Sequence, residues 1–230
     1  MIFDTNLKTN FETTGRLWLR NAISTKDLSH FDIAAAQGGQ VGARINSCQS
    51  LSSALAVQGS LMQAIATIYP KAHPVRVVAF NKTQETNWGV PWHQDRVIAV
   101  AEKCDVLGFD NWTEKRGVWH CEPPHPILDE MLFVRVHLDD TDHNNGAMEI
   151  AVGSHAQGVV PSANAEKIAN RFPIESCDAK RGDVLILKML TLHRSKPSMA
   201  TSNRRAFRID FASAGLPTPL NWRSVTPDLT

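Results

Sequence analysis

The segment MLFVRVHL at residues 131–138, followed by the run DDTDHNNG at 139–146, decides the fold class of this chain. The first segment is short, apolar and β-branched, which predicts a strand, and the second holds the Asp, Asn and Gly residues that form turns. Similar short apolar segments lie on both sides along the chain, at 74–80, 92–100, 148–152, 184–189 and 205–211. Helices do not alternate regularly with these segments, so they predict an antiparallel sandwich or barrel.

Residues 1–72 precede these strands and are expected to form a mostly helical flank. One helix is predicted to begin at Ser24, which with Asp27 resembles a helix start, and to stop at the Gly38-Gly39 pair. A second helix is predicted over 48–68, where Ala, Leu, Gln and Met are frequent. The expected buried stripe of the first helix is Leu28, Phe31, Ile33 and Ala34.

We expect a single domain over residues 1–230, and we see no linker that would divide it. Its β core is predicted over 73–212, and residues 213–230 form a C-terminal tail. Within the core, residues 105–126 contain two tryptophans and several prolines but no clear period, so we expect a long irregular insertion. Loops of this length often serve as lids or binding loops.

The composition predicts an ordinary globular protein without a highly charged partner. Apolar residues make up 43% of the chain, and 24 Lys and Arg against 23 Asp and Glu give a net charge of +1. This balance gives no reason to expect nucleic acid or an anionic membrane as a partner. The N-terminal residues do not resemble a signal peptide, and no apolar run is long enough to span a bilayer. The four cysteines are scattered and form no C-x-x-C motif, so we expect reduced thiols and a cytoplasmic location.

His93 and Asp95 form a His-x-Asp pair within the 92–100 segment, and His193 follows the apolar 184–189 segment. In an extended strand, side chains at i and i+2 leave the same face with Cα atoms about 7 Å apart, so both can bind one ion. Two imidazoles and one carboxylate form the facial triad of non-heme Fe(II) oxygenases, which leaves coordination positions open. A closed sheet brings distant strands to one site. The sequence therefore predicts His93, Asp95 and His193 as metal ligands and catalytic residues.

Three other histidines are weaker candidates for the same cavity. His137 lies on the 131–138 strand beside Arg135, and His120 and His125 lie in the insertion. Trp119 and His120 are our candidates for contact with a substrate, because they belong to a segment that could cover the barrel. The alternative for this insertion is a simple hydrophobic plug over the barrel.

Arg204 and Arg205 are the candidates to bind the acid that an iron oxygenase needs as a source of electrons. A 2-oxo acid can chelate iron and supply electrons, and its far carboxylate would need a fixed cation in a dry pocket, a role that suits the bidentate fork of arginine. Alternation along the strand puts Arg205 with Phe207, Ile209 and Phe211 on one face, which is expected to pack against helices. Arg204 shares the other face with the small Ala206, which leaves room for a ligand, so we favour Arg204 over Arg205.

The chain resembles the phytanoyl-CoA dioxygenase family of Fe(II)/2-oxoglutarate-dependent oxygenases over about residues 75–212. The motifs that carry this likeness occur in the family's order: Trp92-His93-Gln94-Asp95, Val136-His137-Leu138-Asp139-Asp140, Asn145-Gly146-Ala147-Met148, Gly153-Ser154-His155, Gly182-Asp183-Val184, His193-Arg194-Ser195 and Arg204-Arg205-Ala206. The resemblance implies a double-stranded β-helix, a jelly-roll or cupin-like barrel, with flanking helices. The fold class expected is thus mainly β with helices (α+β).

The resemblance also implies roles for individual residues. His93, Asp95 and His193 would bind Fe(II), Arg204 would hold the distal carboxylate of 2-oxoglutarate, and Ser195 would hydrogen-bond the same carboxylate. A further co-substrate contact maps to Asn81 or Lys82, and the sequence leaves both open. The N-terminal region is short relative to the acyl-CoA hydroxylases of the family, and no surface for coenzyme A is evident.

The function expected is hydroxylation of a C–H bond in a small organic substrate, with O2 and 2-oxoglutarate as co-substrates and succinate and CO2 as products. Asp95 favours hydroxylation or another oxidation, because in related halogenases a small residue replaces this carboxylate. Two alternatives remain open at this level: a non-catalytic cupin-like protein that binds a small molecule, and a metal-dependent hydrolase that uses the same residues around zinc.

Overall fold

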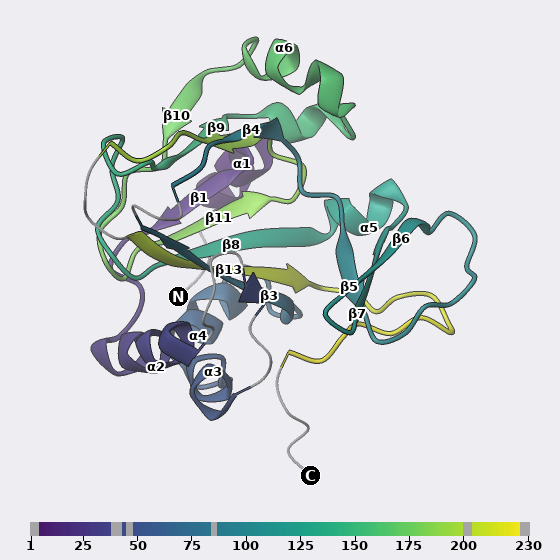
Figure 1. Cartoon of the computed structure of the whole chain (residues 1–230), viewed down its shortest axis with the longest axis horizontal. Coiled ribbons are helices and arrows are strands. Elements are labelled where there is room, and N and C mark those ends of the chain that lie inside the picture. Colours follow the sequence, from purple (N-terminus) through teal and green to yellow (C-terminus); the bar gives the residue numbers. More distant parts are fainter. Residues whose placement is uncertain (1–4, 38–42, 45–47, 84–86, 200–203, 226–230) are drawn as a thin grey trace.

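The computed structural model describes the chain except for residues 1–4, 38–42, 45–47, 84–86, 200–203 and 226–230. In the described part, two antiparallel sheets lie one above the other, and helices pack below the larger sheet (Figure 1). The prediction of a mainly β fold with flanking helices is confirmed.

The larger sheet has six strands in the order β1-β11-β8-β13-β3-β2, and the smaller sheet has four in the order β10-β9-β12-β4. Consecutive strands mostly change sheets, as at β3 to β4, β8 to β9, β11 to β12 and β12 to β13. This repeated crossing winds the chain into a jelly roll. The strand bounds are β1 Arg16–Leu19, β2 Ala43–Arg44, β3 His73–Lys82, β4 Val90–His93, β8 Met131–His137, β9 Met148–Ala151, β10 Ile174–Ser176, β11 Val184–Lys188, β12 His193–Ser195 and β13 Arg204–Ala212.

Strand β13 shows how the larger sheet separates two environments. Phe207, Ile209 and Phe211 are buried in an apolar cluster with residues of the helices, and the Phe207 ring lies 5.2 Å from that of Phe31. Arg204 and Arg208 alternate with them and line a cavity on the opposite face. Both faces of the sheet are therefore covered, one by helices and the other by the smaller sheet.

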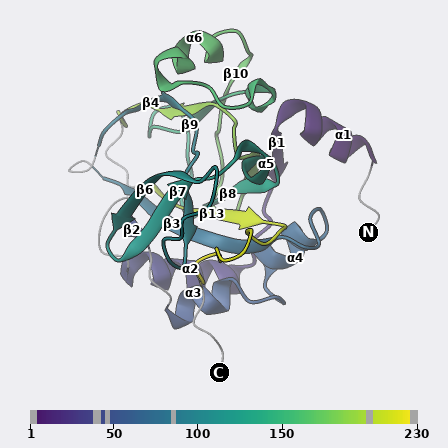
Figure 2. The ribbon, with the colours of Figure 1, turned by 90° about the vertical axis from the view of Figure 1, so that its right-hand side faces the viewer.

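Helices α2 (Thr25–Gln37), α3 (Gln49–Ala54) and α4 (Ser60–Ala66) cover the outer face of the larger sheet (Figures 1 and 2). The hydroxyl oxygen of Ser24 accepts a hydrogen bond from the Asp27 amide at 3.1 Å, which confirms the predicted start of α2. The Asp27 carboxylate in turn accepts hydrogen bonds from the amide and hydroxyl of Ser60 at 2.7 and 2.6 Å. These bonds join the first turns of α2 and α4.

Two details of the helical prediction are wrong. Ile33 is 49% exposed, because two residues of helix rotate it away from the face that carries Phe31. The single helix expected over 48–68 is two helices, and Gly59 caps the second one in an extended conformation (φ −71°, ψ 153°). The Gly38-Gly39 stop lies outside the described residues, and the last residue of α2 is Gln37.

The strand expected over 92–100 is also two strands. β4 ends at His93, and β5 (Ile98–Val100) belongs to a separate three-stranded sheet with β7 (Val118–Glu122) and β6 (Asp110–Lys115). The prediction of an irregular insertion over 105–126 is therefore wrong as well, because most of it forms the β6–β7 hairpin. Its turn holds Arg116 and Gly117 at φ +55° and +73°, as two-residue hairpin turns require. Figure 2 shows this hairpin nearest the viewer.

The remaining elements are one edge strand, three helices and two short turns. Strand β1, which the sequence analysis missed, pairs with β11 at the edge of the larger sheet. The other helices are α1 (Thr5–Thr14), α5 (His125–Asp129) and α6 (Ala165–Ala169), with short 3-10 turns at Ser154–Gln157 and Ser162–Asn164. All four cysteines are described, and each is a free thiol. Among the described residues, no helix is both apolar and long enough to cross a membrane.

Candidate functional site

A cavity of about 310 Å³ lies between the two sheets. Strands β3, β8 and β13 of the larger sheet and strands β4, β9 and β12 of the smaller sheet all contribute to its wall. The lining residues are Arg76, Val78, Phe80, Lys82, Trp88, Val90, His93, Asp95, Phe133, Arg135, Met148, His193, Arg194, Ser195, Arg204 and Arg208. The wall thus combines a few apolar side chains with an unusual number of cations.

The two candidate histidine ligands lie opposite each other on neighbouring strands. His93 at the end of β4 pairs in register with His193 at the start of β12, and their ring centroids are 4.2 Å apart. The register shifts between His193 and Ser195, so β4 carries an extra residue in the stretch that contains Pro91. A proline suits this irregular pairing because it has no amide hydrogen for the ladder.

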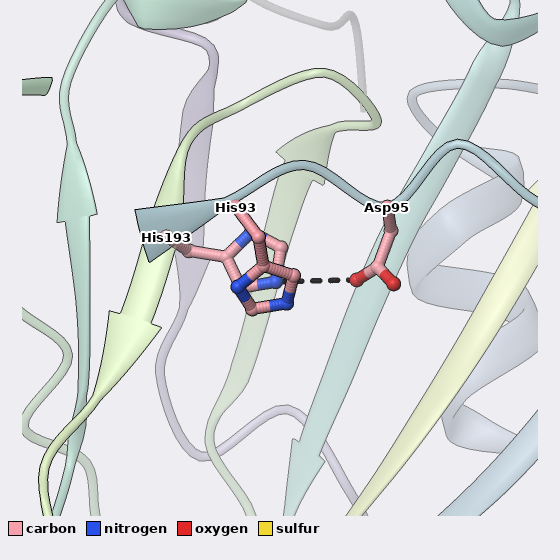
Figure 3. Close-up of side chains that lie close together, drawn as sticks. All are labelled: His93, Asp95 and His193. Carbon is pink, nitrogen blue, oxygen red and sulfur yellow. Dashed lines mark ion pairs between the residues drawn. The ribbon is translucent and has the colours of Figure 1, made fainter. Parts of the chain in front are cut away.

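Asp95 lies close to the two histidine rings, but it is outside strand β4. It lies in the segment between β4 and β5, so the expectation that His93 and Asp95 share one strand face is wrong. Gln94 holds this segment: its amide nitrogen donates to the carbonyls of Gly158 and Leu190, and its amide oxygen accepts from the Val160 amide. Asp95 Oδ2 lies 3.1 Å from His193 Nε2 (Figure 3).

The three side chains fit a metal ion in their donor chemistry. One ligand atom from each of His93, Asp95 and His193 lies within 4.8 Å of the other two. The Nδ1 atoms of His93 and His193 lie 2.8 and 2.9 Å from the carbonyls of Pro91 and Thr191. Because a carbonyl oxygen only accepts, both Nδ1 atoms carry the hydrogen, and each Nε2 lone pair is left for a cation. Burial and the neighbouring His193 also lower the pKa of His93, which favours the neutral ring that metals bind.

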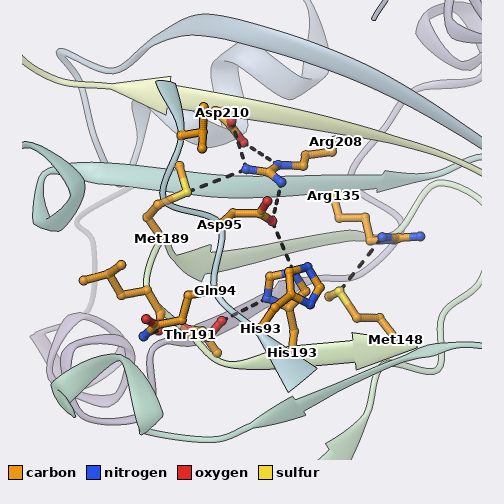
Figure 4. A network of polar contacts seen from close by, with 12 residues as sticks. His93, Gln94, Asp95, Arg135, Met148, Met189, Thr191, His193, Arg208 and Asp210 are labelled. Atoms are coloured by element: carbon orange, nitrogen blue, oxygen red, sulfur yellow. Dashed lines mark hydrogen bonds and ion pairs between the residues drawn. The ribbon is translucent and has the colours of Figure 1, made fainter. Parts of the chain in front are cut away.

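A buried ionic network supports Asp95 on the side away from the two histidines (Figure 4). The Arg208 guanidinium binds both carboxylate oxygens of Asp210, at 2.7 and 3.0 Å, and also contacts Asp95. Burial alone would raise the pKa of Asp95, but Arg208 and His193 outweigh it and hold this pKa well below its usual value. The carboxylate is therefore charged and fixed in place. Neither Arg208 nor Asp210 was singled out as a site residue from the sequence.

This network gives a stability prediction. Replacing Arg208 with methionine leaves the fully buried Asp210 without its main partner, and removal of one partner from a buried ion pair costs about 3–5 kcal/mol. The double variant Arg208→Met/Asp210→Leu should recover part of this loss, because the buried Asp210 charge is removed together with its main partner, whereas Asp95 and Arg76 each lose one ionic contact. Chemical denaturation of the metal-free protein gives the free energy of unfolding of both variants. Arg205→Met is the matched control, because Arg205 lies on the same strand but is about one-third exposed, and it should cost about 1 kcal/mol or less.

Arg204 lines the cavity, and Arg205 does not. Arg205 instead binds Asp139 with two nitrogens and also pairs with Asp32 at the outer face. Arg204 is buried, and its Nε and Nη1 atoms have no hydrogen-bond partner among the described residues. This arrangement suits a carboxylate supplied by a ligand. The alternation of side chains on β13 is as the sequence analysis expected.

Lys82 and Ser195 lie in the wall with Arg204, whereas Asn81 is exposed. Lys82 donates to the Lys196 carbonyl at 2.6 Å, and burial, with Arg204 and Arg135 adding to it, lowers its pKa to about 8. Of the two positions left open by the sequence, only Lys82 therefore faces the cavity.

The weaker candidates lie elsewhere. Trp119 and His120 are on β7 of the three-stranded sheet, and neither is among the residues that line the cavity. His125 pairs with Asp129 at 3.3 Å on α5. His137 is buried beside Trp18, and burial followed by Arg135 holds its pKa well below the usual value. Contact of Trp119 or His120 with a substrate stays a prediction.

Comparison with known proteins gives one family. The family model described as phytanoyl-CoA dioxygenase (PhyH) matches residues 20–206. No curated protein matches the sequence.

Several solved structures share the fold at low sequence identity. AviO1 from Streptomyces viridochromogenes Tue57 has a TM-score of 0.65 at 17% identity, over 94% of this chain and 98% of that one. The non-heme alpha-ketoglutarate-dependent carbocyclase SnoK from nogalamycin biosynthesis has a TM-score of 0.67 at 14% identity, over 96% and 87%. HygX from Streptomyces hygroscopicus, solved with nickel and 2-oxoglutarate bound, has a TM-score of 0.61 at 14% identity, over 96% and 90%. These similarities confirm the jelly-roll fold.

Proposed function

The chain belongs to the phytanoyl-CoA dioxygenase family, and from that premise we propose that it is an Fe(II)- and 2-oxoglutarate-dependent oxygenase that hydroxylates a C–H bond of a small organic molecule. One observation carries this proposal. A His-Asp-His cluster and a buried arginine without a partner face the same cavity. A binding protein without catalysis needs neither the cluster nor the separate arginine.

His93, Asp95 and His193 would hold a ferrous ion, which would allow dioxygen to react with electrons from 2-oxoglutarate, itself oxidised to succinate and CO2. The two Nδ1 hydrogen bonds to backbone carbonyls fix both rings and keep their Nε2 atoms directed at the ion. Gln94 and Arg208 fix Asp95 by its backbone segment and by its carboxylate. The chain therefore sets the ligand geometry before any cofactor arrives.

Arg204, Ser195 and Lys82 would hold the distal carboxylate of the co-substrate. Ala206 lies two residues from Arg204 on the same face of β13, so its small side chain leaves room for the body of 2-oxoglutarate. Phe133, Met148 and Phe80 form an apolar wall of the cavity and limit access of water to the reacting atoms.

Hydroxylation is the reaction we propose among several that this chemistry permits. Asp95 provides the third protein ligand, so the small residue that gives related halogenases their halide position is absent at this site. The fold is shared with SnoK, which is described as a carbocyclase, and the products of the reaction therefore need to be identified directly. The free thiols are compatible with a reducing compartment, and the proposal places the enzyme in the cytoplasm.

Anaerobic titration tests this function. The protein with Fe(II) should develop a visible charge-transfer band when 2-oxoglutarate is added, and Zn(II) in place of Fe(II) should give none. On admission of oxygen, 2-oxoglutarate should be converted to succinate. A protein that binds Zn(II) tightly but forms no band with Fe(II) and 2-oxoglutarate would instead be assigned to metal-dependent hydrolysis.

A further inference from the structure

Arg135 is a buried cation that the proposed chemistry does not use. It lies on β8, is 5% exposed and lines the cavity. Its Nε atom has no hydrogen-bond partner among the described residues, and its Nη1 contacts only the sulfur of Met148, at 4.0 Å. Its guanidinium carbon lies 5.5 Å from the centre of the Phe80 ring. No carboxylate of the described residues forms an ion pair with it.

Such a charge is costly to bury without a counterion. Burial, followed by repulsion from Arg204 and Arg208, lowers the pKa of Arg135 to about 9. Arginine otherwise keeps its charge throughout the accessible range, so this depression shows that the surroundings oppose the cation. A buried charge that is kept despite this cost needs an anion that arrives with a ligand.

The negative charge of 2-oxoglutarate is not enough to balance the cations that line the cavity. Among the described residues, five cations that line the cavity have no carboxylate partner other than Asp95 or Asp210. These cations are Arg76, Lys82, Arg135, Arg204 and Arg208. Five positive charges therefore face two negative ones. Arg194 is outside this count because Glu149 pairs with it at 2.5 Å. A ferrous dication and a 2-oxoglutarate dianion would cancel each other. Three positive charges then remain in excess, or two where Lys82 is neutral.

The sheet register separates the backbone of Arg135 from that of Arg204, the residue proposed to bind the distal carboxylate of the co-substrate. Arg135 pairs directly with Arg208, the residue that contacts Asp95, whereas Ala206 and Arg204 lie two and four residues before Arg208 on β13. The backbone of Arg135 is therefore level with the metal ligands, on the strand next to β13. Met148, which its guanidinium contacts, pairs with Ser195 in the opposite sheet. The Arg135 side chain therefore extends from β8 into the cavity and reaches the opposite sheet.

We propose that the substrate of this enzyme carries an anionic group, a carboxylate or a phosphate monoester, and that Arg135 binds it. The inference rests on the proposed oxygenase function, because the excess of charge is counted with the ferrous ion and the co-substrate in place. Met148 and Phe80 beside the guanidinium would contact the apolar part of the same molecule. Arg135 is then the residue that selects acids over their neutral analogues.

The test uses anaerobic protein loaded with Fe(II) and 2-oxoglutarate and three probes of similar length: hexanoate, hexyl phosphate and hexanamide. Calorimetric titration should show that at least one anion binds about tenfold or more tightly than the amide, since a charged hydrogen bond contributes about 1.5–3 kcal/mol. Arg135→Met should abolish this preference. The comparison of hexanoate with hexyl phosphate decides which anion the site takes. Arg194→Met is the matched control, because it removes a cavity arginine that Glu149 already neutralises, and it should keep the preference.

Two further measurements separate the possible failures. The affinity for 2-oxoglutarate, read from the charge-transfer band, should change less than about threefold in Arg135→Met, because a neutral side chain at this position leaves Arg204 and the metal ligands in place. The melting temperature of the ligand-free variant should be no lower than that of the wild type, because an unpaired charge has been removed. Equal binding of acids and amide by the wild type, or a loss of 2-oxoglutarate affinity as large as in Arg204→Met, would overturn the proposal for Arg135 while the oxygenase function stood. Absence of the band in the wild type would instead refute the oxygenase function.

Discussion

Replacing Asp95 with alanine is expected to reduce Fe(II) affinity by more than about 100-fold and to abolish 2-oxoglutarate turnover. Loss of groups that merely support a metal ligand costs about 10–100-fold, so loss of a ligand itself should cost more. Asp95 is the only carboxylate in the cluster that the structure shows around His93 and His193 in the described part of the chain. Without it, the ion would keep two imidazoles and would lie next to the Arg208 cation.

The measurement is anaerobic Fe(II) titration followed by succinate analysis, with circular dichroism to check the fold. The barrel should remain, because Arg208 keeps its two bonds to Asp210. Asp110→Ala is the matched control, since Asp110 is an exposed carboxylate on β6, and it should bind Fe(II) as the wild type does. Wild-type turnover by Asp95→Ala would show that the metal centre is elsewhere.

Replacing Arg204 with methionine is expected to weaken 2-oxoglutarate binding by about 10- to 150-fold, while Fe(II) binding stays within about threefold of the wild-type value. The factor follows from about 1.5–3 kcal/mol for hydrogen bonds to a charged group. Two nitrogens of Arg204 have no partner among the described residues, so a carboxylate can take both. Methionine fills much of the same volume, and the burial that lowers the pKa of Arg204 to about 10 no longer opposes a charge there.

Titration of the charge-transfer band at fixed Fe(II) gives the dissociation constant directly. Arg205→Met is the control, because the neighbouring arginine points to the outer face and binds Asp139 and Asp32. A larger effect at Arg205 than at Arg204 would contradict the assignment. Lys82→Met should give an intermediate loss at neutral pH, because Lys82 lies in the same wall but holds the Lys196 carbonyl.

The metal cluster could be found from the sequence, although the geometric argument for Asp95 was wrong. The strand argument placed His93 and Asp95 on one face, but β4 ends at His93, and three hydrogen bonds of Gln94 hold the next segment away from the ladder. The residue types were sufficient because two imidazoles and one carboxylate form the ligand set of non-heme iron and occur here in the order of the family that the chain resembles. The path of the backbone between them depends on Gly158, Val160 and Leu190, which lie more than sixty residues further along the chain.

The choice between Arg204 and Arg205 was predictable because alternation along a strand is a local property. The period of two assigns Phe207, Ile209 and Phe211 to one face, and this face packs against the helices as expected. The predictions over 48–68 and 105–126 were wrong because each depends on a short break or turn. Gly59 separates α3 from α4, and Arg116-Gly117 turns the β6–β7 hairpin.

The sequence by itself determined the mainly β class, the three residues proposed as metal ligands and the face of β13 that carries Arg204, because these depend on residue chemistry and on the two-residue period of a strand. The tertiary structure alone decided which side chains are buried without a partner. Arg135 and Arg208 are both arginines and pair in register on adjacent strands, yet Arg208 has Asp210 and Asp95, whereas Arg135 has no carboxylate among the described residues. The charge that a ligand must bring follows from that difference, because the cost of a buried ion depends on its neighbours in space and not on its neighbours along the chain.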